Sequence, residues 1–230
     1  MPRIIQKNLG KSNSYLIKSD TGYILLDAGV KNNSNKIQAV MSENNANIGD
    51  INLIIITHVH TDHVGSLAEL SSATGAEILV HANGAEALQK GKTSFPKGTS
   101  WFFKFISALA NSFVGPSGKF DPVHPDILIE EDYKLNEFGV EGKVIPTPGH
   151  TQDSSSVIIG DKHCLCGDTM FNLFPNSVYP VFANNKEMLL QSWQKLKRLD
   201  CDYFYPGHGD TFEKEKFLQT YEAYLGSGEM

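Results

Sequence analysis

The sequence contains few cysteines and no long apolar run. Its three cysteines, Cys164, Cys166 and Cys201, are an odd number in a chain of 230 residues, which fits reduced thiols better than a disulfide framework. No stretch is long and apolar enough to span a bilayer, and the first residues, MPRIIQKNLG, lack the apolar core of a signal peptide. The sequence therefore predicts a cytoplasmic protein without a transmembrane segment.

Runs of basic residues are also absent. The net charge is −6 and no run of Lys or Arg interrupts the chain, so a nucleic-acid partner is not expected. With 40% hydrophobic and 20% charged residues, the composition is that of an ordinary soluble globular protein. The length suits one domain, which we take to span residues 1–230. The oligomeric state is left open, a homodimer included.

Strand-like and helical segments alternate in two passes along the chain. The first pass has the strand-like runs SNSYLIKS, GYILLDAG, INLIIIT and AEILVH, with helical stretches near 33–46, 63–70 and 83–90. The second pass has DILIEEDYKL, GKVIPTPGH, SSSVIIGDKHCLCGD and DYFYPGH, with helices near 186–199 and 213–225. Because hairpins and β–α alternation occur together, the pattern predicts a layered α/β fold with mixed sheets.

An insert at about 91–125 separates the two passes and is rich in Gly, Pro, Ser and Phe. Within it, WFFKFISALANSFV is an amphipathic helix with an aromatic face, which could pack on the core or form a lid, a cleft wall, or a membrane or partner contact. The flanking Gly and Pro residues favour a hinged lid. Six aromatic residues of this helix and of the stretch after residue 168 are predicted to line one apolar substrate pocket: Trp101, Phe102, Phe105, Phe171, Phe174 and Tyr179.

The strand INLIIIT ends in the motif THVHTDH, residues 57–63. Side chains two residues apart on a strand point to one face, so His58 and His60 can bind one cation together. Asp62 and His63 follow at the turn into a helix, where they can reach a second position. Imidazole and carboxylate groups suit a borderline divalent metal such as zinc. Three histidines and an aspartate within six residues therefore predict a metal site.

Three further candidate ligands each follow a strand-like run and have a neighbouring glycine that allows a sharp turn. They are His150 in PTPGHT, Asp168 in CGDT and His208 in YPGHG. In this order, and with Leu25-Leu26-Asp27-Ala28-Gly29 before them, the motifs closely resemble the metallo-β-lactamase superfamily over residues 12–212. The resemblance implies a four-layer αββα sandwich of two mixed β-sheets, with the active site along one edge between the sheets.

The resemblance also implies which candidate residues would hold each metal and which would orient a ligand. His58, His60 and His150 would hold one metal, Asp62, His63 and His208 a second, and Asp168 would bridge the two. Asp27 would orient a ligand by hydrogen bonding. The implied cofactors are two divalent ions, zinc foremost, with manganese or iron as alternatives.

Two such ions suit hydrolysis of a small-molecule ester, thioester or lactone by a metal-bound hydroxide, with Asp62 handling its proton. The pocket predicted above suits a substrate with an apolar tail. The chain departs from the β-lactamases, which carry arginine, cysteine and lysine where it has His63, Asp168 and Phe171. It matches glyoxalase II at every ligand, but only 22 residues follow His208, so we do not expect the helical glutathione-binding domain of those enzymes.

Two other classes of function stay open at this point. The persulfide dioxygenases keep similar motifs but bind a single iron through two histidines and an aspartate, here His58 or its neighbour, His150 and Asp168. A catalytically inactive binding protein is the third class, and seven intact ligand positions argue against it. Flavodiiron reductases are excluded because they carry glutamate in place of His60, and the nucleases of the superfamily because the chain has no basic module.

Overall fold

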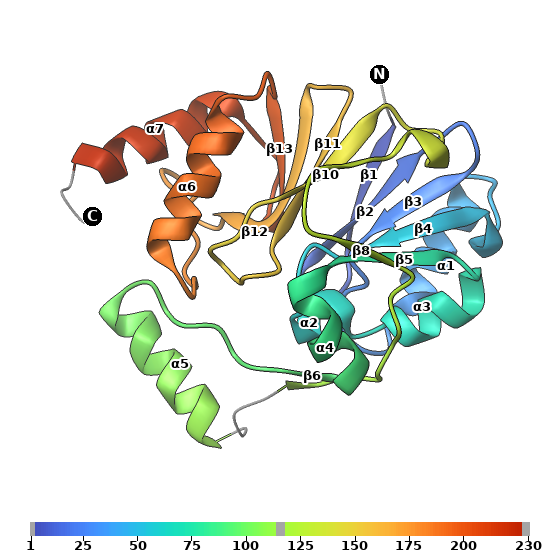
Figure 1. Cartoon of the computed structure of the whole chain (residues 1–230), viewed down its shortest axis with the longest axis horizontal. Coiled ribbons are helices and arrows are strands. Elements are labelled where there is room, and N and C mark those ends of the chain that lie inside the picture. Colours follow the sequence, from blue (N-terminus) through green and yellow to red (C-terminus); the bar gives the residue numbers. More distant parts are fainter. Residues whose placement is uncertain (1–2, 114–117, 227–230) are drawn as a thin grey trace.

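The computed structural model describes residues 3–113 and 118–226 and arranges most strands in two six-stranded sheets (Figure 1). The first sheet contains, in spatial order, β1 (Ile4–Asn8), β2 (Asn13–Lys18), β3 (Tyr23–Leu26), β4 (Ile51–Ile55), β5 (Glu77–His81) and β8 (Ile127–Ile129). The second contains β14 (Phe212–Glu213), β13 (Tyr203–Gly209), β12 (His163–Asn172), β11 (Ser155–Ile159), β10 (Gly142–Pro146) and β9 (Tyr133–Lys134). Both sheets combine parallel and antiparallel neighbours, as predicted.

Helices cover the outer face of each sheet. Beside the first sheet lie α1 (Ser34–Glu43), α3 (Leu67–Thr74) and α4 (Ala82–Lys90), and beside the second lie α6 (Lys186–Lys197) and α7 (Lys214–Gly226). The short α2 (Thr61–Val64) follows β4, and two single 3₁₀ turns occupy Ile48–Asp50 and Asn136–Phe138. In the described ranges, no helix combines the length and apolarity needed to cross a membrane.

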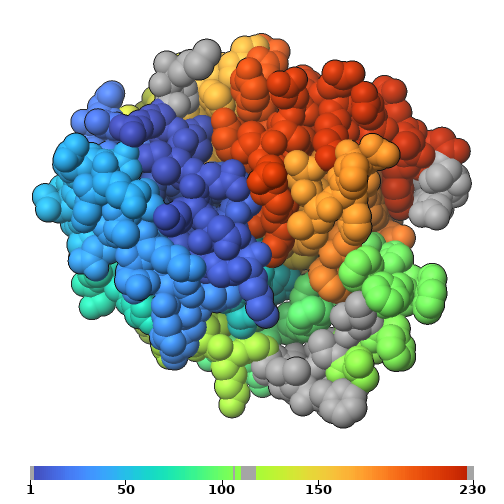
Figure 2. Space-filling model, turned by 180° about the vertical axis from the view of Figure 1, so that it is seen from behind, coloured from blue at the N-terminus to red at the C-terminus, as the bar shows by residue number. Residues whose placement is uncertain are grey.

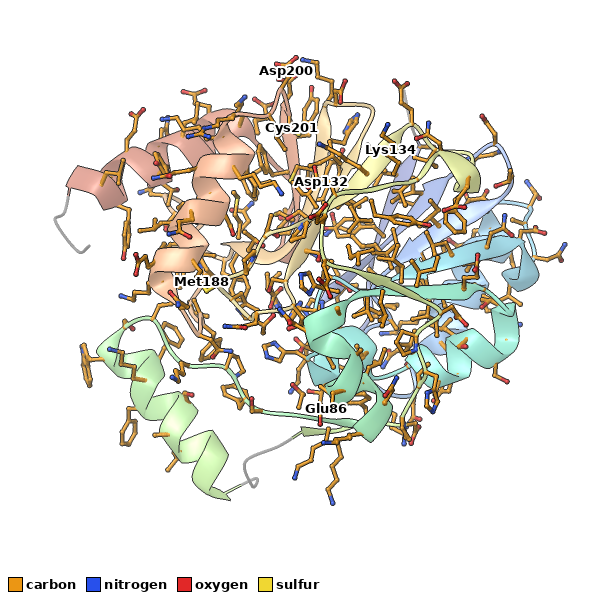
Figure 3. All side chains as sticks on the ribbon, in the orientation of Figure 1. Glu86, Asp132, Lys134, Met188, Asp200 and Cys201 are labelled. Atoms are coloured by element: carbon orange, nitrogen blue, oxygen red, sulfur yellow. The ribbon has the colours of Figure 1, made fainter. Side chains whose placement is uncertain are left out.

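Three clusters of buried apolar residues separate these layers. Leu25 and Ile54 face the helices of the first half, whereas Ile24 and Leu53, one residue away on the same strands, face the second sheet. This alternation is the two-residue period of strands buried on both faces. On the second sheet, Cys164 packs toward the outer helices with Trp193. Side chains fill the space between the sheets (Figure 3), and the four-layer αββα sandwich is confirmed.

The segment predicted as one helix from His63 to Leu70 is instead two helices with a break between them. Ser66 is the residue at the break, with a φ of −99° and a ψ of 11°. Its hydroxyl accepts a hydrogen bond from Asn33 N–H (2.9 Å) and donates one to the Val30 carbonyl (2.7 Å). A serine bonded to a neighbouring loop in this way competes with a continuous helix.

The run DILIEEDYKL was predicted as one strand, and it divides between the two sheets. Its first part is β8 of the first sheet and its second part is β9 of the second, with Glu130–Asp132 crossing between them. At the crossing, Asp132 (Figure 3) forms ion pairs with Lys143 at 2.9 Å and Lys195 at 3.0 Å, both in the second half. A local sequence pattern cannot show that one extended run changes sheet.

The insert forms β6 (Lys92–Thr93) and β7 (Gly118–Lys119), which pair with each other, and α5 (Trp101–Phe113), which lies at the edge of the molecule (Figures 1 and 2). The predicted helix is confirmed, but the interpretation that its aromatic face packs in the core is wrong. Trp101, Phe102 and Phe105 are 81%, 51% and 63% exposed. The opposite side of the helix contacts the body instead, through the Phe103 ring against Phe182 and the Ser107 hydroxyl, which donates to the Pro96 carbonyl (2.7 Å).

Candidate metal centre and substrate cavity

Three histidine nitrogens meet where β4 ends and the chain turns toward α2. His58 Nε2 lies 2.9 Å from His60 Nδ1, and His60 Nδ1 lies 3.0 Å from His150 Nε2, although His150 follows β10 in the other sheet. Neighbouring ligand atoms of a tetrahedral zinc site, with bonds of roughly 2.0–2.1 Å, lie roughly 3.3 Å apart. The three nitrogens therefore have nearly the spacing that one shared cation requires.

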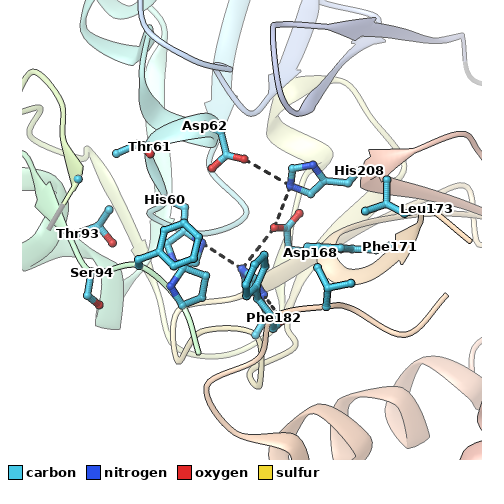
Figure 4. Close-up of a pocket in the computed structure, with 15 residues that line it drawn as sticks. His60, Thr61, Asp62, Thr93, Ser94, Asp168, Phe171, Leu173, Phe182 and His208 are labelled. Atoms are coloured by element: carbon cyan, nitrogen blue, oxygen red, sulfur yellow. Dashed lines mark hydrogen bonds and ion pairs between the residues drawn. The ribbon is translucent and has the colours of Figure 1, made fainter. Parts of the chain in front are cut away.

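A second group of ligand atoms lies beside the first. His208 Nε2, at the end of β13, is 3.4 Å from Asp62 Oδ2, and His63 Nε2 is 3.9 Å from the same oxygen. Figure 4 shows Asp62 and His208 pointing toward each other across the cavity. In each of the two groups, the ligand atoms lie within 4.8 Å of one another, so each group could hold a metal ion.

Asp168 lies between the two groups and contacts both. Its Oδ2 is 3.3 Å from His150 Nε2 and 3.3 Å from His208 Nε2, while its Oδ1 is 3.4 Å from His63 Nε2. Gly167 directly before it has a φ of +50°, and the β12–β13 register shifts on either side of that glycine. A left-handed glycine in such a bulge redirects the following side chain out of the regular ladder and into the site.

Two buried polar atoms of this cluster have no hydrogen-bond partner among the described residues: His63 Nε2 and Asp168 Oδ1. Buried polar atoms almost always have a partner, because leaving one unpaired costs free energy. The two atoms lie 3.4 Å from each other, and a cation bound beside them would contact both. Imidazole and carboxylate donors in this arrangement fit a pair of divalent metals.

Asp27 supports the second group through a hydrogen bond to His63. Its carboxylate accepts hydrogen bonds from Thr57 N–H and from the Thr57 hydroxyl, both at 2.8 Å, and its Oδ2 also lies 2.8 Å from His63 Nδ1. With its Nδ1 proton held there, His63 presents Nε2 to the cluster. The sequence indicated this role for Asp27, whereas Thr57 was not singled out, although it directly precedes His58.

Backbone carbonyls orient the two histidines that come from the second half. His150 Nδ1 lies 2.8 Å from the Phe182 carbonyl and His208 Nδ1 lies 3.0 Å from the Lys11 carbonyl. Each contact leaves Nε2 free to face the cluster. Lys11 lies in the loop between β1 and β2. The next residue of that loop, Ser12, also holds Asp62, because its hydroxyl donates a hydrogen bond to the Asp62 backbone carbonyl. No motif marks these supports, since any residue can offer a carbonyl.

The histidines of the cluster form two sets that differ in the direction in which their pKa is shifted. Burial lowers the pKa of His58, His60 and His150, which keeps these rings neutral and able to bind a metal near neutral pH. Burial acts in the same direction on His63 and His208, but the neighbouring carboxylates, Asp168 first among them, together outweigh it and raise the pKa of both.

The Asp168 carboxyl responds in the opposite sense. Burial alone would raise its pKa, but the surrounding histidines, His208 and His63 first among them, hold that pKa well below its ordinary value. Asp168 is therefore ionised and suited to contact two cations at once.

A cavity of about 220 Å³ opens over the cluster (Figure 4). Asp62, His150, Asp168 and His208 lie at its base, and Phe171 stands between the two histidines. His60 and Thr61 also line it. The rest of the wall comes from the insert and from the chain after β12, and the sequence did not indicate these residues because no motif marks them. They are Thr93, Ser94, Phe95, Pro96, Gly118, Leu173, Val181 and Phe182.

Of the six aromatic residues predicted to line the substrate pocket, Phe171 lies in this cavity and the structure places the other five outside it. Trp101, Phe102 and Phe105 are exposed on α5, and Phe174 is 46% exposed. Tyr179 stacks on Tyr224 with ring centroids 4.8 Å apart. The insert does form part of the wall, but through Phe95 and Pro96, which precede the helix.

Comparisons with known proteins agree with this geometry. A probable metallo-hydrolase of Methanocaldococcus jannaschii is 28% identical over 210 residues, which cover 90% of this chain and 91% of the relative. A hydroxyacylglutathione hydrolase of Rhodopseudomonas palustris is 28% identical over 171 residues, 74% of this chain, and the match spans 52% of that relative's length. An archaeal metallo-β-lactamase superfamily protein from Sulfolobus tokodaii has the same fold, with a TM-score of 0.69 at 22% identity over 99% of this chain and 88% of the other.

The family model of the metallo-β-lactamase superfamily matches residues 8–208, which include every member of both ligand groups. This chain therefore belongs to the metallo-β-lactamase superfamily.

Proposed function

We propose that this protein is a dinuclear metal-dependent hydrolase that cleaves a small ester, thioester or lactone. The observation that carries the proposal is the position of Asp168 between two adjacent ligand groups, with Asp168 Oδ1 and His63 Nε2 both buried and without a hydrogen-bond partner among the described residues. His58, His60 and His150 would hold one ion, Asp62, His63 and His208 the other, and Asp168 both. The likeness to hydroxyacylglutathione hydrolases supports thioesters as the first class to test.

Two divalent ions at these positions would activate water, polarise the scissile carbonyl oxygen and stabilise the leaving group; zinc is the first candidate. The chain's own residues then supply position and proton transfer. Asp62 has a side chain 24% exposed toward the cavity, against 4% for Asp168. In this proposal, Asp62 takes a proton from the attacking water and passes it to the leaving group.

The cavity favours a substrate with a compact apolar acyl group. Apart from the proposed ligands, the described residues that line it carry no charged side chain. Its volume of about 220 Å³ is below the roughly 300–1,000 Å³ of pockets for drug-sized ligands. Phe95, Phe171 and Phe182 would contact the acyl group and exclude water from the reacting carbonyl.

Elemental analysis of protein purified without chelator, together with assays on acyl thioesters of two to eight carbons, tests the proposal. We expect two divalent ions per chain, and no turnover after chelation until metal is restored. His208→Ala should lose one ion, while the exposed His124→Ala should keep both. A single iron per chain, with oxygen uptake on a persulfide, would overturn the proposal in favour of a dioxygenase.

A further inference from the structure

The helix α5 has its apolar face turned outward. At 100° per residue, Trp101, Phe102, Phe105 and Leu109 fall within about 100° of arc. All four are exposed, between 45% and 81%. The residues on the opposite side contact the body, and Figure 3 shows side chains of α5 extending away from the rest of the molecule. An amphipathic helix normally buries its apolar stripe, so this face is built to contact something outside the described chain.

The charge around this face is of one sign. Residues 87–120 contain five lysines and no Asp or Glu, in a chain whose net charge is −6, which leaves −11 for the remainder. Of these lysines, Lys90 pairs with Glu86, whereas Lys92, Lys97, Lys104 and Lys119 form no ion pair with any described residue. The lysines are spaced out rather than consecutive, so they form no basic run in the sequence.

Two of these lysines lie directly opposite each other. Lys92 and Lys119 are register partners in the β6–β7 pair, and both are exposed. Like charges in directly opposed cross-strand positions destabilise a sheet unless an anion neutralises them. β6 and α5 lie along the same edge of the molecule (Figure 1). The opposed pair therefore points independently to an anionic partner at the edge of the molecule where α5 lies.

We propose that α5 and the β6–β7 pair form a docking surface for an anionic lipid bilayer. Trp101, Phe102, Phe105 and Leu109 would enter the headgroup region with the helix lying in the plane of the membrane, and the lysines would contact anionic headgroups. An exposed Trp beside Lys is the side-chain combination that favours the interface between lipid and water. A second copy using the same face would bring two lysine-bearing segments together, which like-charge repulsion opposes.

Docking in this way would place the cavity beside the membrane. Phe95, which is 41% exposed, Pro96 and Thr93 belong to the same lysine-bearing segment and line the cavity wall. An apolar substrate could then pass from the lipid to the site with little exposure to water. The docking itself does not depend on the reaction catalysed, so it can be tested even if the proposed hydrolysis is wrong.

Co-sedimentation of the metal-loaded full chain with vesicles tests the surface. We expect binding to vesicles of phosphatidylcholine with 30% phosphatidylglycerol, weaker binding to phosphatidylcholine alone, and release by high salt. Tryptophan emission should shift to the blue on binding, since Trp101 is exposed and the other tryptophan, Trp193, is already buried. Trp101→Phe should keep most of the binding and lose the shift.

Two further variants locate the contact. Phe105→Glu should weaken vesicle binding at least tenfold, and Lys104→Gln about fivefold on anionic vesicles only. Leu128→Glu is the matched control, because Leu128 is 53% exposed on β8 outside the segment, and it should bind normally. Absent vesicle binding, or binding that Phe105→Glu leaves intact, overturns the proposal. Self-association abolished by Phe105→Glu without vesicle binding would assign the face to a second copy instead.

Discussion

Asp62 and Asp168 are both carboxylates of the same cluster, but they face different surroundings. Asp168 contacts both histidine groups from a buried position, whereas the Asp62 carboxylate contacts His63 and His208 and opens onto the cavity. Asp62→Asn keeps an oxygen that can bind a metal and loses the ability to carry a proton. We expect turnover to fall about a hundredfold or more, with little change in melting temperature. Steady-state kinetics and thermal unfolding of one preparation measure both; near-normal turnover contradicts the assigned role.

Asp27 can be tested as a residue that affects metal binding through His63, which it orients. It touches Thr57 and His63 but does not line the cavity. Asp27→Asn should leave His63 free to rotate and weaken metal binding about 10–100-fold, as loss of such supports does at other metal sites. Thr57→Ser keeps the hydroxyl and serves as the control. Metal titration with a competing chelator measures the effect, and equal affinity in both variants would mean that Asp27 has a structural role only.

The order in which metals leave on acidification follows from the two kinds of histidine. Protons compete with metal for imidazole, so a histidine with a raised pKa loses its metal at a higher pH than one with a lowered pKa. Burial lowers the pKa of His58 and His60, whereas Asp168 raises the pKa of His63 and His208. As the pH falls, the ion of the second group should leave first.

Metal content after dialysis at a series of pH values measures this order. Wild-type protein should pass from two ions to one before it loses both. His208→Ala should begin with one ion and lose it at the same low pH as the wild-type protein loses its last. Simultaneous loss of both ions, or earlier loss from His208→Ala, would falsify the order.

At the level of elements, α5 shows that an amphipathic pattern gives the face of a helix but not what that face contacts. Phe105→Ala should change the free energy of unfolding by no more than about 0.5 kcal/mol, as exposed substitutions usually do. Trp193→Ala, fully buried between the second sheet and its helices, should cost about 3–5 kcal/mol. Urea unfolding of the two variants measures the contrast. A large loss for Phe105→Ala would place that residue in the core.

The sequence allowed prediction of what is local or encoded in motifs. The strands on both sides of Asp20-Thr21-Gly22, the helix near 33–46 and the grouping of His58 with His60 depend on periodicity and turn residues, and each is present. Features set by distant parts of the chain could not be predicted. The crossing at Glu130–Asp132, the break at Ser66 and the carbonyl of Phe182 behind His150 all depend on contacts with segments that a local pattern does not contain.

Considered as a whole, the molecule brings its ligands together from both halves. His58, His60, Asp62 and His63 follow a strand of the first sheet. In the second sheet, His150 follows β10, Asp168 lies within β12 and His208 lies near the end of β13. Between the sheets, the apolar layer holds the halves together without metal. The metals would therefore add a second link at the edge of the sandwich, where His63 Nε2 and Asp168 Oδ1 otherwise have no hydrogen-bond partner among the described residues.

Removal of the metals should lower stability without abolishing the fold. Ions that bind only the folded state stabilise it by about 2.7 kcal/mol at a free concentration a hundred times the dissociation constant. For a chain of this size that corresponds to roughly 5–10 °C in melting temperature. Calorimetry before and after chelation, with zinc restored at the end, measures the shift, and far-ultraviolet circular dichroism should show the same secondary structure throughout. His58→Ala and His208→Ala, one from each half, should each show part of the shift even with metal in excess, because each disables one group. A melting temperature that chelation leaves unchanged would mean that the apolar layer alone sets stability and that the ions do not link the halves.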